Sequence, residues 1–254
     1  MKICRQNDNK GFLLYIDILG FSKFVEKNNP QIILSIIKST LEYFNMWKKA
    51  NQSMDVIYFS DSFIFYQNKP NYIDTAFCDI IGISQNIFNY LLSKEIPVRG
   101  AISFGDFYVD TLEKNNQKIY FGQSLVEAHR AEKRENWIGI TIEESVYKQI
   151  SADIKASFIG ESLKPSNQEH FLLNPFSHIN YTNWDEPDVC EELINEIKCL
   201  KFIYKKVVEF KNKGDFTSRV ASKYFNTLAF FENVIDKYYL EQALKFDFKE
   251  YKYD

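Results

Sequence analysis

The sequence is poor in the residues that build zinc sites and disulfide frameworks. It has four cysteines, no two of which form a Cys-x-x-Cys pair, and only three histidines. A Cys/His zinc site is therefore not expected. The cysteines, Cys4, Cys78, Cys190 and Cys199, are predicted to be buried free thiols in a protein of a reducing compartment.

An excess of positive charge and long apolar runs are also missing. The formal net charge is −3, so no general basic field is available to hold nucleic acid or anionic lipid. No run approaches the roughly 18 apolar residues of a membrane span, and the N-terminus has no apolar signal core. We expect a soluble, cytoplasmic protein that has no nucleic-acid or membrane partner.

The most informative stretch runs from Gly11 to Ser22, Gly-Phe-Leu-Leu-Tyr-Ile-Asp-Ile-Leu-Gly-Phe-Ser. Its residues 12–16 are apolar, which is typical of a buried strand, and Asp17 ends the run. A turn built on Gly20 follows, and then a helical pattern. A carboxylate at a strand end, beside the amides of a tight turn, suits a divalent cation and the phosphates it carries. The alternative is an aspartate that caps the next helix.

Periodicity predicts the elements that follow this first strand. Helices are expected over residues 31–47, 72–92, 123–134 and 143–150, and strands over residues 97–104, 106–109, 118–121, 137–142, 155–159 and 170–173. Residues 54–66 read as a β-hairpin that turns at 60–62, and residues 106–109 are expected to pair back on 97–104. The order β-α-β-β-α-β predicts an α+β fold with a ferredoxin-like core and extra strands.

The composition changes after Pro175. Residues 180–187 are polar and turn-rich and are predicted to be a linker. Two long helices are expected after it, over about 188–213 and 216–239. We therefore divide the chain into a core domain, 1–178, and a C-terminal helical extension, 179–254, that packs against the core or a partner subunit.

A second acid, Asp61, lies at the tip of the predicted hairpin. In a ferredoxin-like core we expect the first strand to lie beside the strand that follows the first helix, so that Asp17 and Asp61 meet. Two carboxylates in that position suit two Mg²⁺ or Mn²⁺ ions. Each acid alone favours a turn aspartate chosen for its backbone geometry, but the matching positions of the pair favour metal.

The stretches that carry Asp17 and Asp61 resemble motifs of class III nucleotidyl cyclases. Residues 12–22 resemble the first motif, in which a strand ends in a metal-binding Asp and an apolar residue precedes Gly-Phe/Tyr-Ser/Thr. Residues 57–65 resemble the second motif, a Gly-Asp pair followed by a strand, with Ser60 at the position of the glycine.

Two further stretches follow in the order of the same family. Residues 98–105 are similar to the strand that carries Arg-x-Gly-x-x-x-Gly, with the first glycine displaced. Residues 120–130 look like the helix motif Gly-x-x-Val-Asn-x-Ala-x-Arg. The resemblance covers about residues 11–175 and implies the class III cyclase catalytic core.

The resemblance implies a two-metal mechanism. Asp17, Asp61 and the carbonyl of Ile18 would hold two Mg²⁺ or Mn²⁺ ions, while the ribose 3′-oxygen of a nucleoside triphosphate attacks the α-phosphorus and pyrophosphate leaves. The phosphate-binding backbone amides would be those of Leu19, Gly20, Phe21 and Ser22.

Arg130 would stabilise the charge that develops on the α-phosphoryl group. In the family this arginine comes from the opposite subunit, which implies a head-to-tail homodimer with two shared active sites. The alternative for Arg130 is a solvated helix residue that pairs with Glu127. Nearby, His129 is expected to pack, and Lys164 loosely matches a phosphate-contacting lysine of the family.

The positions that read the base depart from the purine cyclase pattern. Ile57 and Ile119 stand where purine cyclases have a lysine and an aspartate, and Val126 replaces an asparagine. None of these side chains can hydrogen-bond a base. One interpretation is a site that reads a smaller base by packing, with Phe21 among its walls. The other is a catalytically inactive module that binds a nucleotide or dimerises.

Both metal-binding acids and the arginine are present, which favours activity. Stand-alone cyclases with this degenerate motif set resemble the pyrimidine cyclases of bacterial antiphage defence, known as Pycsar. In those systems infection triggers synthesis of cyclic UMP or cyclic CMP, which activates a partner effector. The resemblance therefore implies a lyase acting on UTP or CTP and a separate cyclic-nucleotide effector protein.

Overall fold

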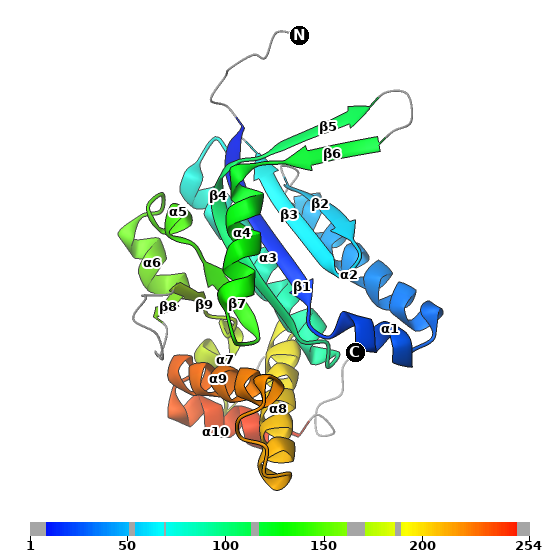
Figure 1. The fold of residues 1–254 in the computed structure, drawn as a ribbon. Helices are drawn as coiled ribbons and strands as arrows, with labels where there is room; N and C mark the ends of the chain where they lie inside the picture. Colours follow the sequence, from blue (N-terminus) through cyan, green and yellow to red (C-terminus); the bar gives the residue numbers. More distant parts are fainter. Residues whose placement is uncertain are drawn as a thin grey trace.

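A seven-stranded mixed sheet, in the order β2-β3-β1-β4-β7-β9-β8, forms the centre of the computed structural model (Figure 1). The structure describes residues 9–50, 54–68, 70–112, 117–161, 171–185 and 189–247. The strands of this sheet are β1 (Lys10–Ile18), β2 (Met54–Phe59), β3 (Ser62–Asn68), β4 (Val98–Asp106), β7 (Gly139–Ile142), β8 (Ile159–Glu161) and β9 (Phe171–Leu173).

The first four strands confirm the predicted ferredoxin-like core, because β2, β3, β1 and β4 lie side by side and are antiparallel. One expected neighbour was wrong. The strands beside β1 are β3 and β4, and β2 lies at the edge of the sheet. The second strand of the hairpin, β3, lies between β2 and β1. The tip of the hairpin still reaches the end of β1, because Ser62 pairs with Asp17.

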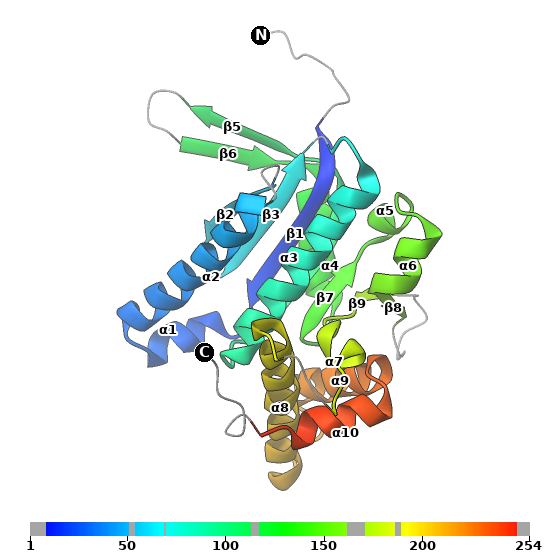
Figure 2. The ribbon, with the colours of Figure 1, turned by 180° about the vertical axis from the view of Figure 1, so that it is seen from behind.

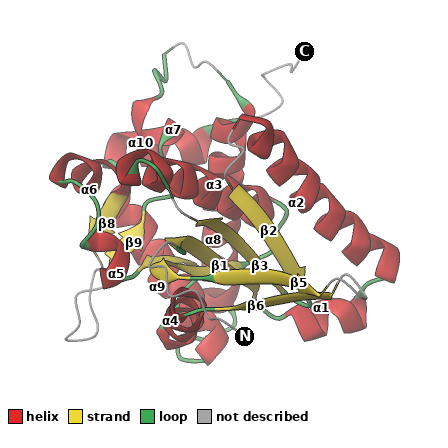
Figure 3. Ribbon diagram, turned by 90° about the horizontal axis from the view of Figure 1, so that it is seen from above, coloured by secondary structure: helices red, strands yellow, loops and turns green. Residues whose placement is uncertain are grey.

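Helices cover both faces of the sheet, as Figures 1 and 2 show. Helices α2 (Pro30–Ala50) and α3 (Ile73–Ser93) lie on one face, and α4 (Gln123–Arg134) lies on the other. Figure 3 shows the sheet between these layers. Strand β1 alternates accordingly: Phe12, Leu14 and Ile16 join the large core, while Leu13 joins a smaller cluster under α4.

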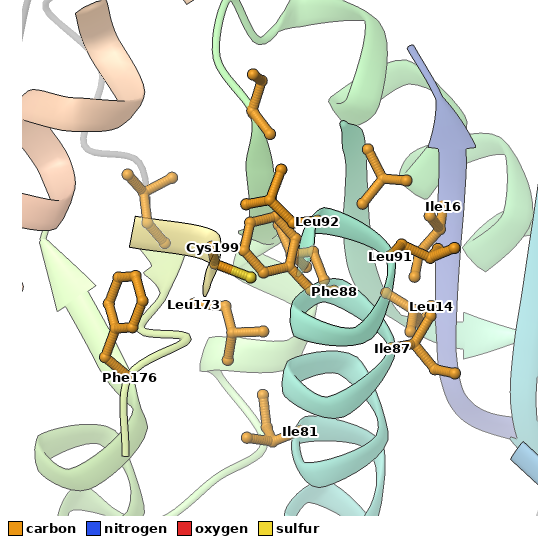
Figure 4. Close-up of a cluster of buried hydrophobic side chains, with 14 of the residues drawn as sticks. Leu14, Ile16, Ile81, Ile87, Phe88, Leu91, Leu92, Leu173, Phe176 and Cys199 are labelled. Carbon is orange, nitrogen blue, oxygen red and sulfur yellow. The ribbon is translucent and has the colours of Figure 1, made fainter. Parts of the chain in front are cut away.

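The C-terminal helices continue the large core. Helix α8 (Glu191–Asn212) packs against α3, and α9 (Arg219–Val234) and α10 (Lys237–Lys245) gather around α8. Buried side chains of β1, α3, β9 and α8 form one cluster (Figure 4), in which Cys199 lies near Phe88 and Leu92. The boundary at residue 178, where α7 (His178–Tyr181) begins, stays a prediction.

Several predicted elements differ in detail. Residues 106–109 do not return along β4, because β5 (Tyr108–Leu112) pairs with β6 (Gln117–Phe121) in a separate ribbon. Residues 155–159 are not a strand but belong mostly to α6 (Ala152–Phe158). The last predicted helix is split into α9 and α10.

Shorter helices complete the fold. Helix α1 (Phe21–Lys27) follows the turn after β1, and α5 (Glu144–Tyr147) is shorter than the predicted 143–150. The first residues of the predicted linker at 180–187 end helix α7. Within the described ranges, no helix combines the length and apolarity that a membrane crossing requires.

Candidate active site

Asp17 lies on the face of the sheet that α4 covers. The pleat of β1 points Leu13, Tyr15 and Asp17 to the same side, and Leu13 and Tyr15 contribute to the cluster under α4. Ser62 of β3 lies opposite Asp17 on one side, and Arg99 of β4 lies opposite it on the other. The predicted metal-binding acid is thus held at the centre of the sheet.

Asp61 meets the end of β1, as predicted. Its carbonyl oxygen accepts a hydrogen bond from the Ile18 amide at 2.9 Å. The next residue, Ser62, shares a 2.7 Å hydrogen bond with the hydroxyl of Tyr15. Backbone and side-chain bonds therefore tie the hairpin tip to β1, and Asp61 is close enough for its charge to act on Asp17.

The turn before Asp61 carries backbone strain. Ser60, which stands where the cyclase motif has glycine, has a φ of 58°. Residues that carry a Cβ rarely adopt this left-handed conformation, whereas glycine adopts it freely. The hydroxyl of Tyr58 donates to the Ser60 carbonyl and helps to hold the turn. The turn therefore adopts the left-handed conformation with a serine at the position where the motif has glycine.

The turn after Asp17 is built as predicted, with one exception. Gly20 has a φ of 74° and precedes helix α1, and its carbonyl accepts from the Phe24 amide at 3.0 Å. The amide of Leu19, however, donates to the Pro97 carbonyl at 2.9 Å. Leu19 was therefore wrongly predicted to offer its amide to a phosphate, because β1 uses that amide to extend its contact with the start of β4.

Two charged residues of the site were not singled out from the sequence. Glu132 of α4 is buried, at 2% exposure, and forms an ion pair with the guanidinium of Arg99. The Nη2 atom of the same arginine lies 3.8 Å from Oδ2 of Asp17. The available signal was an acid on the buried, alanine-rich side of an amphipathic helix, where an unpaired carboxylate is rare.

This arrangement makes the ionised form of Asp17 costly. Burial raises its pKa most, and the charges of Glu132 and Asp61 raise it further, against the opposing effect of Arg99 and Lys223. The result is a pKa of about 7 instead of 3.8. A divalent cation would relieve this repulsion, and the two carboxylates with the Ile18 carbonyl are the oxygen donors that Mg²⁺ and Mn²⁺ prefer. The residues present fit such an ion.

We expect metal affinity to depend on pH because Asp17 must lose its proton before it binds a cation. Below the pKa of about 7, Mn²⁺ affinity should rise by about tenfold per pH unit, and it should level off at higher pH. Calorimetry between pH 5 and 8 in buffers of different ionisation enthalpy measures the affinity and the proton released. Asp17→Asn is the control, and it should remove both. An affinity of the wild type that is constant over this range would contradict the assigned role.

Arg130 points away from the acids of its own chain. On α4, the ring of His129 packs edge-on against Tyr15 at 5.4 Å, and Glu132 is one turn further along the same side. Arg130 is two residues from Glu132, which places it about 200° around the helix, and it is exposed. In the described part of the chain no ion pair joins Arg130 to Glu127, although Arg130 is a solvated helix residue, and its catalytic role stays a prediction.

Solved structures with the same fold are guanylyl cyclase domains. The dimeric guanylyl cyclase domain of the RhoGC fusion protein from the aquatic fungus Blastocladiella emersonii matches with a TM-score of 0.52 and 14% identity, over 65% of this chain and 96% of that one. The guanylate cyclase domain of RhGC from Catenaria anguillulae, in complex with GTP, matches with a TM-score of 0.53 and 13% identity, over the same shares. This chain has the fold of a class III cyclase catalytic domain. No protein-family model and no curated protein matches the sequence.

The cyclase fold places the predicted base-reading positions on three elements. Ile57 of β2 is nearly covered in the cluster under α4, whereas Ile119 of β6 and Val126 of α4 are 40% and 47% exposed. Phe21 is partly buried at the start of α1. The role of these four side chains in reading a base stays a prediction. Lys164 lies outside the described residues.

Large apolar side chains are exposed on α4, on the ribbon of β5 and β6, and at the end of β2. Phe121 is 57% exposed and stacks on Tyr108 at 5.1 Å in the ribbon of β5 and β6, and Phe59 at the end of β2 is 68% exposed. Ile119 and Val126 add to the apolar surface of the ribbon and α4. Exposed aromatic side chains of this kind are typical of a surface that meets another protein.

A second group of potential metal ligands lies in the C-terminal extension. Atoms of His178, Cys190 and Glu192 lie within 4.8 Å of one another. The neighbouring buried Glu196 accepts hydrogen bonds from the amides of Ser177 and His178 and from the His178 ring. These bonds attach the start of α7 to α8, which accounts for the buried carboxylate as a structural anchor.

Proposed function

We propose that the protein is a nucleotidyl cyclase that converts a pyrimidine nucleoside triphosphate, UTP or CTP, to a 3′,5′-cyclic nucleotide and pyrophosphate. The convergence of Asp17 and Asp61 within a cyclase fold carries this proposal, since Ile18 and Asp61 are joined by a hydrogen bond of 2.9 Å. The GTP bound in the Catenaria domain shows that this fold accommodates a nucleoside triphosphate in that relative.

The site supplies the groups that this reaction needs. Asp17, Asp61 and the Ile18 carbonyl would hold two Mg²⁺ or Mn²⁺ ions, which lower the pKa of the ribose 3′-hydroxyl and neutralise phosphate charge when bound. The amides of Gly20, Phe21 and Ser22, at the start of α1, face the phosphates in this proposal. The guanidinium of Arg99, on the neighbouring strand β4, contacts both Asp17 and Glu132 and helps to hold them in place.

The chemical step is an internal displacement. The 3′-oxygen forms a bond to the α-phosphorus, and the bond from that phosphorus to the oxygen bridging to the β-phosphate breaks. Pyrophosphate leaves with the bonding electrons, and the proton of the 3′-hydroxyl is released to solvent. Negative charge accumulates on the α-phosphoryl oxygens in between, and an arginine side chain stabilises it.

The arginine for this step would come from a second copy of the chain. Arg130 is exposed and directed away from Asp17, on a helix beside the exposed apolar side chains of the ribbon. A head-to-tail homodimer would bring Arg130 of each chain to the acids of the other and would bury Phe121 and Val126. One dimer then contains two complete sites.

The preference for a pyrimidine rests on what the base-reading positions lack. Ile57, Ile119 and Val126 offer packing but no side-chain hydrogen bond, so they do not reproduce the contacts that select a purine. The corresponding biological role is synthesis of a second messenger in bacterial antiphage defence, read by a separate effector protein.

Incubation of the purified protein with each of the four ribonucleoside triphosphates and Mn²⁺, followed by mass spectrometry, tests the proposal. We expect cyclic UMP or cyclic CMP, with one pyrophosphate for each cyclic nucleotide. If a folded dimer binds nucleotide but forms no cyclic product, the protein is an inactive binding module. A cyclic purine as the main product would contradict the assigned base while retaining the reaction.

A further inference from the structure

The C-terminal extension reaches the acid cluster through helix α9. In Figures 1 and 2, α9 lies beyond the end of the sheet at which β1 finishes. Lys223, in the second turn of α9, acts electrostatically on Asp17, and Glu132 and Asp17 act on it in return. A residue more than 200 positions along the chain from Asp17 therefore belongs to the same charged cluster.

The middle of α9 is held in place by contacts with the segment that leads into β7. Thr227 Oγ1 accepts a hydrogen bond from the Ile138 amide at 2.8 Å, and the side chain of Asn226 donates to the Asn136 carbonyl at 2.9 Å. The rings of Trp137 and Phe230 meet edge to face at 5.1 Å. Because residues four apart share one side of a helix, Lys223 lies on the side of α9 that Thr227 anchors to the core.

Lys223 lies among charges of both signs but has no ion-pair partner within 4.0 Å in the described part of the chain. Its ammonium is partly buried, and burial lowers its pKa, as do the nearby cations Arg99 and Arg219. Glu132 is already paired with Arg99, and Asp17 and Asp61 are the other carboxylates of this cluster. Divalent cations bound to them would leave Lys223, Arg99 and Arg219 with an excess of positive charge, which a polyanion would stabilise.

We infer that Lys223 binds the triphosphate of the substrate, so that the C-terminal extension forms part of the nucleotide site. The identity of that anion as a nucleoside triphosphate rests on the proposed cyclase function. An ammonium is suited to phosphate oxygens as a compact charge with three donors. Arg219, one turn earlier on α9 and exposed, adds to the same positive field.

The test is binding of inorganic tripolyphosphate, in the presence of Mg²⁺, to the full chain by calorimetry. Lys223→Gln should weaken this binding by about tenfold or more, since a hydrogen bond to a charged group contributes that much. Lys223→Arg should retain most of it. Lys237→Gln is the matched control, because Lys237 is an exposed lysine of the same extension, and it should bind as the wild type does.

In the cyclase assay Lys223→Gln should raise the KM for the nucleotide, while its thermal midpoint stays at that of the wild type. The inference is overturned if the wild type does not bind tripolyphosphate, or if Lys223→Gln binds it equally well and keeps the same KM. Binding that depends on Lys223 in a protein that makes no cyclic product would sustain the inference and refute the cyclase activity. Normal turnover of Lys223→Gln, with tripolyphosphate binding and a KM equal to those of the wild type, would refute the inference and sustain the cyclase activity.

Discussion

Asp61→Asn is expected to reduce cyclic nucleotide synthesis by about 10³-fold or more, because loss of a metal-binding carboxylate removes several kcal/mol of charge stabilisation from the transition state. The substitution keeps the size of the side chain, and the backbone bond from the Ile18 amide to the Asp61 carbonyl at 2.9 Å does not depend on the carboxylate. The fold should therefore persist. The rate of pyrophosphate release, measured with saturating Mn²⁺, gives the effect.

A matched control lies on the same hairpin. Asp55 of β2 is exposed, with 57% of its side chain accessible, and pairs with Lys48. Asp55→Asn should leave turnover close to that of the wild type, since surface ion pairs contribute about 0–1 kcal/mol to stability. Equal activity of Asp61→Asn and Asp55→Asn would remove Asp61 from the site.

A mixture of two inactive variants is expected to recover activity. Arg130→Ala should lose about 10³-fold in turnover, as removal of an arginine finger does. In a head-to-tail dimer, a chain with Asp61→Asn still offers its Arg130, and a chain with Arg130→Ala still offers its acids. The mixed dimer therefore contains one complete site, and random exchange should restore about one quarter of the wild-type rate.

Mixing at increasing total concentration provides the measurement, because recovery must follow dimer formation. The matched mixture combines Asp17→Asn with Asp61→Asn. It should stay inactive, since both substitutions damage the same half of every site. Full activity of Arg130→Ala on its own, or no recovery from a mixture shown to form mixed dimers, would contradict a site shared between subunits.

The sequence predicted the local elements of the site well, because a buried strand that ends in an acid leaves a strong local pattern. The strand that carries Asp17, the turn at Gly20 and helix 123–134 were all expected, and the structure has them, with the strand extended by one residue to Ile18. The predicted neighbour of β1 was wrong, because the alternation of buried and exposed side chains along a strand does not determine which strand it pairs with. The same ambiguity misplaced residues 106–109, of which Asp106 ends β4 and only Tyr108 and Val109 pair with another strand, β6.

The remaining site residues depend on contacts between distant parts of the chain. Arg99 and Glu132 become a pair only when α4 lies across β4. Lys223 joins them only when α9 is anchored beside Ile138. In sequence, Arg99 and Lys223 are charged residues among many, and only Glu132 has a local signal, its place on the buried side of an amphipathic helix. Their burial, which the tertiary structure creates, is what marks them as part of the site.

The single hydrophobic cluster shared by α3 and α8 has a consequence for how the protein forms in the cell. As the chain leaves the ribosome, the side of α3 that carries Phe88 and Leu92 emerges long before the segment around Cys199 that covers it. Until α8 is synthesised, this apolar side of α3 stays exposed to solvent. Partly folded intermediates of this kind aggregate or bind chaperones. A chain that ends before α8 would therefore be expected to misfold and to be degraded.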